Sequence, residues 1–215
     1  VCNMLRGLEA DVRLAGVVGD DDGGRLVRRM LRELGVDDSL VLYDALRPTT
    51  TKERFIGRAQ GRHPHQILRV DDEVRDPLRP ELVHELSTRL AAALEHCDVV
   101  LISDYDKGVC TPRLLRQVID AARELGKPVI VDPIRGTDYA RYRGATTMTP
   151  NRLEAELATG IKIETADDAI RAGWKLAREH KLDFGIVTLD RDGMALVTPD
   201  GRGEVYPTQA RAVYD

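Results

Sequence analysis

The sequence predicts an α/β fold in which helices cover both faces of a mostly parallel sheet, with a small pair of strands outside that sheet. Short β-branched runs alternate with helical stretches of about 10–15 residues, which is the pattern of a parallel sheet. The runs at 98–103 and 128–132 are continuously apolar at their centres, as in strands that are buried on both faces. Residues 49–71 instead alternate polar and apolar side chains without a helical period, which predicts the extra pair of strands.

The remaining elements follow from hydrophobic period and from glycine and proline positions. Further strands are expected at 12–18, 40–43, 145–148 and 184–189, with a hairpin at 194–198 and 203–206. Helices are expected at 23–34, 78–96, 112–125, 151–159 and 166–180. Gly35 and Gly126 each follow such a helix, which is a usual helix stop. The chain has 215 residues and domains usually span roughly 100–200, so we expect one domain over residues 1–215.

Composition excludes several classes of protein. The chain is 42% hydrophobic and 32% charged, unlike a disordered or collagen-like chain. Its apolar runs are far shorter than the roughly 18 residues of a membrane span, and its first residues do not resemble a signal peptide. Cys2, Cys97 and Cys110 lack disulfide or metal spacing, so we expect reduced thiols and a cytoplasmic protein. The net charge of −4 argues against a nucleic-acid partner, and no membrane partner is expected.

Polar residues follow three of the expected parallel strands. Asp104 follows the first of them, Asp132 ends the second, and Thr188 ends the third. Ligands bind at the carboxyl ends of parallel strands, so the three ends together favour one binding crevice. Each residue alone is also a common helix cap, and Thr111 is expected to be one.

Residues 47–69 carry an excess of positive charge in a chain that is acidic as a whole. The segment holds one acidic residue, Glu53, against Arg47, Lys52, Arg54, Arg58, Arg62 and Arg69. Such an excess indicates an anionic ligand. A solvated edge strand that is protected by its charges explains the pattern equally well.

Asn151 and Glu154 are three residues apart at the start of an expected helix, so their side chains lie on one face. One interpretation is a capping box, in which the two residues satisfy backbone groups of the first turn. The other is that Glu154 helps to hold a hydrated Mg²⁺ beside nucleotide phosphates at the positive end of the helix. The sequence contains neither Gly-x-Gly-x-x-Gly nor a Walker A motif.

A longer series of motifs covers nearly the whole chain. It comprises Val1-Cys2-Asn3, Gly16-Val17-Val18-Gly19-Asp20, Pro48-Thr49-Thr50-Thr51-Lys52-Glu53-Arg54, Leu68-Arg69-Val70-Asp71, Ser103-Asp104-Tyr105-Asp106-Lys107-Gly108-Val109, Asp132-Pro133, Tyr142-Arg143-Gly144-Ala145-Thr146, Thr149-Pro150-Asn151 with Glu154, and Val187-Thr188-Leu189. In this order and spacing the motifs resemble the PfkB/ribokinase superfamily of carbohydrate kinases. The Ser-Asp-Tyr and Arg-Gly-Ala-Thr segments are most similar to its branch for D-glycero-β-D-manno-heptose 7-phosphate, the kinase domain of the RfaE/HldE type.

The resemblance implies a ribokinase-like (Rossmann-like) sheet between helices, with residues 47–71 as a β-strand lid over the sugar. It implies an enzyme that transfers a phosphoryl group from Mg·ATP to C1 of D-glycero-D-manno-heptose 7-phosphate, which yields the 1,7-bisphosphate for ADP-heptose and lipopolysaccharide core synthesis. ATP and Mg²⁺ would be the cofactors, and a homodimer would form through the lid. A kinase of another sugar, such as a ribokinase or fructokinase relative, and a non-catalytic nucleotide- or sugar-phosphate-binding module are the alternatives.

The resemblance also implies roles for individual residues. The nucleotide would contact Asn151, Arg152, Leu153, Glu154, Thr188 and Gly193, with Glu154 holding Mg²⁺ through water. The sugar phosphate would contact Asn3, Lys52, Arg54, Arg69, Asp104 and Lys107. Arginine suits a phosphate because its guanidinium offers a forked pair of donors, and a closed lid keeps water from competing as the acceptor.

The sequence departs from the family pattern at several positions. Asp106 stands where glycine is usual and Ile134 where lysine is usual, and an acidic Asp106 weakens the attraction for a phosphate near Lys107. The family's N-terminal glycine pair would precede Val1, and its Gly-Ala-Gly-Asp motif, which supplies the catalytic base, would follow Asp215. We therefore expect a chain that is truncated at both ends, and we assign Asp215 no catalytic role. The His-x-Gly-His signature of a fused nucleotidyltransferase is also absent from the sequence.

Overall fold

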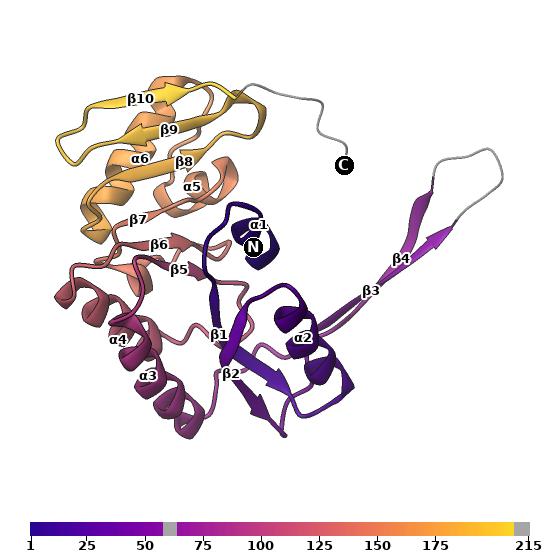
Figure 1. Ribbon diagram of the computed structural model, residues 1–215. Helices are drawn as coiled ribbons and strands as arrows, with labels where there is room; N and C mark the ends of the chain where they lie inside the picture. Colours follow the sequence, from indigo (N-terminus) through magenta and orange to yellow (C-terminus); the bar gives the residue numbers. More distant parts are fainter. Residues whose placement is uncertain (58–63, 209–215) are drawn as a thin grey trace. The chain divides into compact units, whose positions relative to one another are not determined.

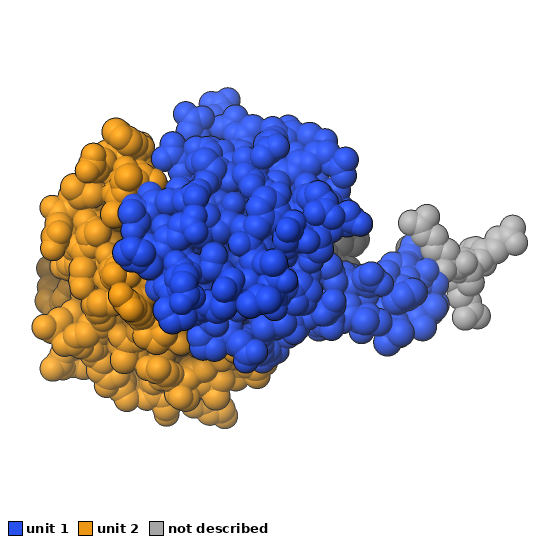
Figure 2. Space-filling model, turned by 90° about the horizontal axis from the view of Figure 1, so that it is seen from below, with its two compact units in different colours: residues 1–90, 107–109 blue, residues 91–106, 110–215 orange. Residues whose placement is uncertain are grey.

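The computed structural model describes residues 1–57 and 64–208 of the chain (Figure 1). Arg58 and Arg62 of the predicted basic segment, and the last residue, Asp215, lie outside the described residues. The chain divides into two compact units, which Figure 2 colours separately. The first comprises residues 1–90 and 107–109, and the second comprises residues 91–106 and 110–215.

Two parallel strands form the centre of the first unit. These are β1 (Arg13–Gly19) and β2 (Asp37–Asp44), and the chain between them forms α2 (Asp22–Glu33). Leu31 of α2 forms a small core with Val18 of β1, Val41 of β2 and Val36, which precedes β2. The strand–helix–strand pattern predicted from the sequence is therefore confirmed here.

The first unit also holds α1 (Cys2–Gly7) and most of α3 (Pro80–Leu94), whose last residues, 91–94, are counted with the second unit. The sequence predicted α3 but not α1, because α1 has six residues and buries none of them, so it carries no apolar period. The helical spacing of apolar residues in α2 predicts a buried face, and the structure buries only part of it. Leu31 is buried, whereas Leu26 and Met30 are 45% and 51% exposed.

A two-stranded ribbon extends from the first unit, as Figure 1 shows. It is formed by β3 (Thr51–Gly57) and β4 (His65–Asp72), which pair antiparallel in a sheet of their own. This confirms the predicted pair of strands outside the main sheet. Lys52 lies opposite Asp71 and Arg54 opposite Arg69, so these four residues share one face of the ribbon. Phe55, Leu68 and Val70 lie on the other face.

The second unit holds a parallel sheet and a three-stranded sheet that ends in a hairpin. The parallel strands are β5 (Val100–Ser103), β6 (Val129–Asp132) and β7 (Thr147–Met148), and the others are β8 (Gly185–Thr188), β9 (Met194–Val197) and β10 (Gly203–Tyr206). The helices are α4 (Pro112–Glu124), α5 (Arg152–Thr159) and α6 (Ala166–His180), with short 3₁₀ turns at Ala140–Tyr142 and Asp190–Asp192. A parallel bridge between Asn151 and Thr188 links the end of β7 to the end of β8.

The core of the second unit is formed by apolar residues of its strands and helices. Ile119, Val129, Tyr142, Met148 and Val187 are fully buried and belong to one apolar cluster. Parallel strands and covering helices together confirm the predicted α/β class. The longest helices of the described residues, α3 and α6, have 15 residues each, and none is long and apolar enough to cross a membrane.

One strand of the second unit is less buried than its sequence predicts. The apolar run at 98–103 indicates a strand that is buried on both faces, but Val99 is 49% and Leu101 is 41% exposed. Val99 precedes β5, and β5 is the end strand of the order β5-β6-β7 among the described strands of the second unit. An apolar run alone does not distinguish a central strand from an edge strand.

Asp21 links the start of α2 by hydrogen bonds to Thr49, which lies just before β3. Its carboxylate caps the helix by accepting from the Gly24 amide at 2.7 Å, and it accepts from the Thr49 hydroxyl at 2.7 Å and the Thr49 amide at 2.8 Å. These hydrogen bonds, those from Thr49 foremost, lower the pKa of Asp21 to about 2.

We predict that Asp21→Asn destabilises the fold at neutral pH and that the difference from the wild type shrinks in acid. The folded-state pKa of Asp21 is depressed, so its contribution is complete above the ordinary aspartate value of 3.8 and is lost as the pH falls through about 2. Urea unfolding between pH 2 and pH 7 measures this. Asp20→Asn removes a charge from the neighbouring residue without touching Thr49, and equal pH profiles for the two variants would contradict the assignment.

Candidate functional site

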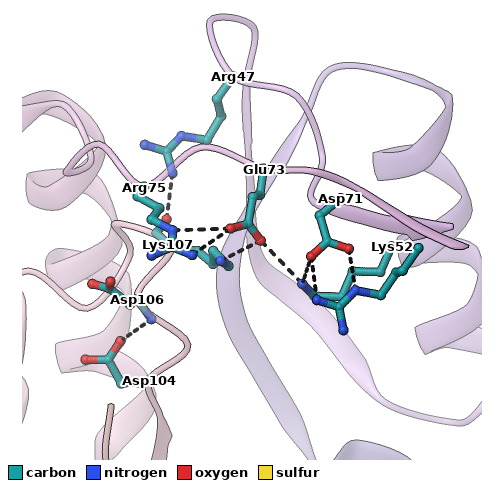
Figure 3. Close-up of polar contacts among 9 residues, drawn as sticks. Arg47, Lys52, Asp71, Glu73, Arg75, Asp104, Asp106 and Lys107 are labelled. Carbon is teal, nitrogen blue, oxygen red and sulfur yellow. Dashed lines mark hydrogen bonds and ion pairs between the residues drawn. The ribbon is translucent and has the colours of Figure 1, made fainter. Parts of the chain in front are cut away.

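Charged side chains gather where β4 leaves the ribbon in the first unit. We call this group the lid cluster, and it comprises Lys52, Arg69, Asp71, Glu73, Arg75 and Lys107 (Figure 3). Two of its members come from β4, one from β3, two from the segment after β4, and one from the loop at 107–109. The cluster therefore brings together residues that are far apart in the sequence.

Glu73 is the centre of the lid cluster. Its Oε2 atom lies 2.6 Å from the Lys107 ammonium and 3.3 Å from that of Lys52, and its Oε1 atom accepts from Arg75 at 3.0 Å. Hydrogen bonds from Lys107 and Arg75 lower the pKa of Glu73 to about 2, so the carboxylate is ionised at any physiological pH. Glu73 was not among the site residues predicted from the sequence. Glu73 directly follows β4 and lies two residues after Asp71, so the alternation of Arg69 and Asp71 on one strand face is the signal that could have pointed to it.

Arg69 and Lys52 meet at Asp71. Two guanidinium nitrogens of Arg69 donate to the two Asp71 oxygens at 2.8 and 2.9 Å, and Lys52 donates to the same carboxylate at 3.1 Å. Arg54 lies opposite Arg69 in the ribbon register and is exposed. The structure thus brings together three of the predicted sugar-phosphate residues, Lys52, Arg69 and Lys107, and leaves Arg54 on the same ribbon face.

The loop that carries Lys107 is held by its backbone. Arg47 donates to the Lys107 carbonyl at 3.0 Å and to the Asp76 carbonyl at 2.8 Å, and the Leu78 amide donates to the Gly108 carbonyl at 3.0 Å. Gly108 has a φ of +77°, and a Cβ there would lie 1.9 Å from the Asp76 oxygen. Arg47, which belongs to the predicted basic segment, therefore stabilises this loop by donating to its backbone carbonyls.

Two other predicted sugar-phosphate residues are placed differently. Asp104 is buried in the second unit, where it accepts from the Tyr142 hydroxyl at 2.7 Å, from Arg141 at 3.3 Å and from the Asp106 amide at 3.0 Å. These contacts occupy its carboxylate and give it a structural role. Asn3 lies exposed on α1. The departure at Asp106 falls at a φ of +55°, a conformation that glycine adopts most readily and aspartate tolerates.

Four strand ends lie in one row at the carboxyl edge of the second unit's sheet. Ser103 of β5 is in register with Asp132 of β6, and its hydroxyl donates to the Asp132 carboxylate at 3.2 Å. Asn151 follows β7 and is bridged to Thr188 at the end of β8. The predicted strand-end residues Asp132 and Thr188 therefore lie on the same edge, which is where parallel sheets bind ligands.

Asn151 and Glu154 form the predicted capping box. The Asn151 side chain accepts from the Glu154 amide at 3.0 Å, and Glu154 Oε2 accepts from the Asn151 amide at 2.9 Å. Within the described ranges, the other Glu154 oxygen accepts no hydrogen bond. A single partly exposed carboxylate oxygen fits the way proteins hold a hydrated Mg²⁺, which keeps several of its waters. No group of three or more His, Cys, Asp or Glu side chains among the described residues could hold a metal directly.

Arg152 and Gly193 organise the turn after β8. Arg152 donates to the Asp192 carboxylate at 2.7 Å and to the Ile163 carbonyl at 2.8 Å. Gly193 has a φ of +101°, and a Cβ at this position would lie 1.9 Å from the Tyr206 carbonyl oxygen. Leu153 is 43% exposed at the start of α5. Arg152 and Gly193 thus have structural duties beside any contact with a nucleotide.

The comparisons with known proteins agree with this architecture. The chain matches the pfkB family carbohydrate kinase profile over residues 1–215, and it belongs to that family. The bifunctional protein HldE of Helicobacter hepaticus is 40% identical over the whole chain, and that of Geotalea uraniireducens is 42% identical. The chain spans 44% and 43% of the length of these two relatives.

Solved structures confirm the ribokinase-like fold. Arabidopsis thaliana ribokinase, determined with ribose and ATP, gives a TM-score of 0.71 at 18% identity and covers 99% of this chain and 66% of its own. Phosphofructokinase-2 from Escherichia coli, determined with potassium, gives a TM-score of 0.72 at 16% identity and covers 98% of this chain and 66% of its own. At these identities the likeness concerns the fold alone.

We predict that Gly193→Ala destabilises the protein by about 3 kcal/mol or more, since it adds a steric clash to a backbone conformation that glycine alone adopts readily. Gly160→Ala is the matched control. Gly160 has a φ of +72°, but no atom lies within 4 Å of the place that a Cβ would take, so its substitution should cost only about 1 kcal/mol. Denaturant unfolding compares the two variants. Equal losses of unfolding free energy would contradict the claim that the close approach of the Tyr206 carbonyl requires glycine at position 193.

Proposed function

We propose that this chain carries out the reaction of an ATP-dependent sugar kinase, with D-glycero-D-manno-heptose 7-phosphate as the acceptor at its C1 hydroxyl. The observation that carries the proposal is the lid cluster, in which Lys52, Arg69 and Lys107 meet at the base of an exposed ribbon. Cations gathered in this way suit a substrate that already bears a phosphate. Membership of the pfkB family of carbohydrate kinases supports the sugar, and the HldE relatives support the heptose branch.

The proposed reaction is an in-line phosphoryl transfer. The C1 oxygen forms a bond to the γ-phosphorus of ATP, the bond from that phosphorus to the β–γ bridging oxygen breaks, and ADP leaves. The hydroxyl proton passes to a carboxylate base, a role that the family resemblance gives to the aspartate of the Gly-Ala-Gly-Asp motif. In this scheme the lid cluster binds the phosphate of the sugar, and Asn151, Glu154 and Thr188 lie on the nucleotide side. Glu154 would hold Mg²⁺ through water, and the ion would neutralise charge on the ATP phosphates.

The direct test measures ADP formation from Mg·ATP with the heptose 7-phosphate, ribose and fructose, with calorimetry of each ligand in parallel. Turnover that requires the heptose phosphate supports the proposal. Turnover with ribose or fructose alone identifies a kinase of another sugar. Tight binding of ATP and sugar phosphate without turnover identifies a binding module instead.

We predict that Glu154→Gln raises the Mg²⁺ concentration needed for half-maximal ATP binding several-fold and changes the unfolding free energy by less than about 0.5 kcal/mol. Glutamine keeps an oxygen for the capping box but loses the negative charge. Asp168→Asn is the matched control, because Asp168 closes an equivalent box with Thr165 on α6. Loss of stability with an unchanged Mg²⁺ dependence would leave Glu154 as a cap only.

We also propose that a second copy of the chain covers the apolar face of the ribbon. Phe55, Leu68 and Val70 share that face and are 50%, 53% and 47% exposed. A two-stranded ribbon is only marginally stable in water by itself, so covering this face would stabilise it. Phe55→Glu with Leu68→Glu should lower the sedimentation coefficient from dimer to monomer. Leu8→Glu, at a residue of the α1 end that is 78% exposed, is the control, and a monomeric wild type would refute the dimer.

A further inference from the structure

One carboxylate oxygen holds two ammonium groups that come from distant parts of the sequence. Glu73 Oε2 lies 2.6 Å from Lys107 Nζ and 3.3 Å from Lys52 Nζ (Figure 3). Two ammonium groups that contact the same oxygen atom repel each other unless an opposite charge lies between them. The ionised Glu73 supplies that charge, because its pKa is lowered to about 2.

The two lysines keep hydrogen-bonding capacity for a ligand. An ammonium group carries three N–H donors. Lys52 contacts the carboxylates of Asp71 and Glu73, and Lys107 contacts that of Glu73. The Lys52 and Lys107 side chains are 38% and 20% exposed, whereas that of Glu73 is 16% exposed. Both lysine side chains are therefore partly exposed, and each ammonium group has donors that Glu73 does not use.

The charge of the lid cluster also matches a phosphate. Four side chains, those of Lys52, Arg69, Arg75 and Lys107, are cationic, and two, those of Asp71 and Glu73, are anionic. The difference of four and two leaves two positive charges. The exposed Arg54 on the same ribbon face and Asp106, which precedes Lys107, add one charge of each sign, so the excess suits a phosphate monoester of charge near −2. The carboxylates thus hold the cations in place without cancelling the attraction for an anion.

We propose that Glu73 is a positioning residue for the sugar phosphate: it holds Lys52 and Lys107 side by side so that their remaining N–H donors converge on the phosphate oxygens. The inference rests on the proposed function and adds a residue that no motif assigns. Without Glu73 the two ammonium groups repel, and their flexible side chains move apart. The expected effect has the opposite sign to simple electrostatics, because removing a negative charge beside an anion site would otherwise tighten binding.

The test compares Glu73→Gln, Glu73→Asp and Asp72→Asn in the chain by calorimetry with heptose 7-phosphate, inorganic phosphate and Mg·ATP. Glu73→Gln should weaken heptose 7-phosphate about tenfold, as expected for the loss of charged hydrogen bonds, and leave the Kd of Mg·ATP unchanged. Glu73→Asp keeps the charge and should lie between the wild type and Glu73→Gln. Asp72→Asn removes the same charge from the opposite ribbon face, where Asp72 pairs with Thr51, and should change the Kd less than about twofold.

Unchanged or tighter binding of heptose 7-phosphate by Glu73→Gln would overturn the inference, and so would equal losses in Glu73→Gln and Asp72→Asn. If Glu73→Gln does not fold, as circular dichroism would show, Glu73→Asp decides: weaker binding than the wild type supports the inference and equal binding overturns it. A wild type that fails to bind heptose 7-phosphate refutes the proposed substrate instead. In that case the same comparison with inorganic phosphate still decides the role of Glu73.

Discussion

The lid cluster depends on a balance between like and unlike charges at the base of an exposed ribbon. Lysine and arginine side chains that lie close together repel one another, and the interposed carboxylates of Asp71 and Glu73 offset this repulsion. Strand geometry makes the arrangement possible, since Arg69 and Asp71 share one face of β4, Lys52 lies across from Asp71, and Glu73 directly follows the strand. The same alternation turns Phe55, Leu68 and Val70 to the other face, where they lie together with Glu53 and Asp72.

Two arginines that the sequence suggests as ligand contacts, Arg47 and Arg152, hold loops together. Arg47 bonds to two carbonyls beside Lys107, and Arg152 bonds to a carbonyl and a carboxylate beside the turn after β8. Loop carbonyls need donors that helices and sheets do not provide, and a guanidinium offers several in a fixed geometry. Asp104 acts in the same way with the opposite polarity, because it gathers a hydroxyl, a guanidinium and an amide in the second unit. These three charged residues therefore stabilise loops, which the sequence motifs do not distinguish from binding a ligand.

The regular elements were predictable where a pattern is local and strong. The helix expected at 166–180 begins and ends at those residues, because a Thr165–Asp168 capping box starts it and its apolar period is unbroken. The hairpin of β9 and β10 follows from its Pro-Asp-Gly turn, and the ribbon follows from its alternation. The short helix α1 and the exposure of β5 were not predictable. The first buries no residue, and the second reflects the strand's place at the edge of its sheet, which depends on the pairing of distant segments.

For the site, local pattern specifies which residue types are present: the cations of 47–69, the Asn151–Glu154 pair and the polar ends of three strands can all be read from the chain. The folded chain alone reveals which of them meet. Lys107 and Lys52 both contact Glu73, Arg54 is exposed opposite Arg69, and Asp104 is buried and accepts a hydrogen bond from Tyr142. The physical reason is that an ion pair between residues far apart in sequence depends on the path of the backbone between them, whereas a cap or a strand face depends only on neighbours a few residues away.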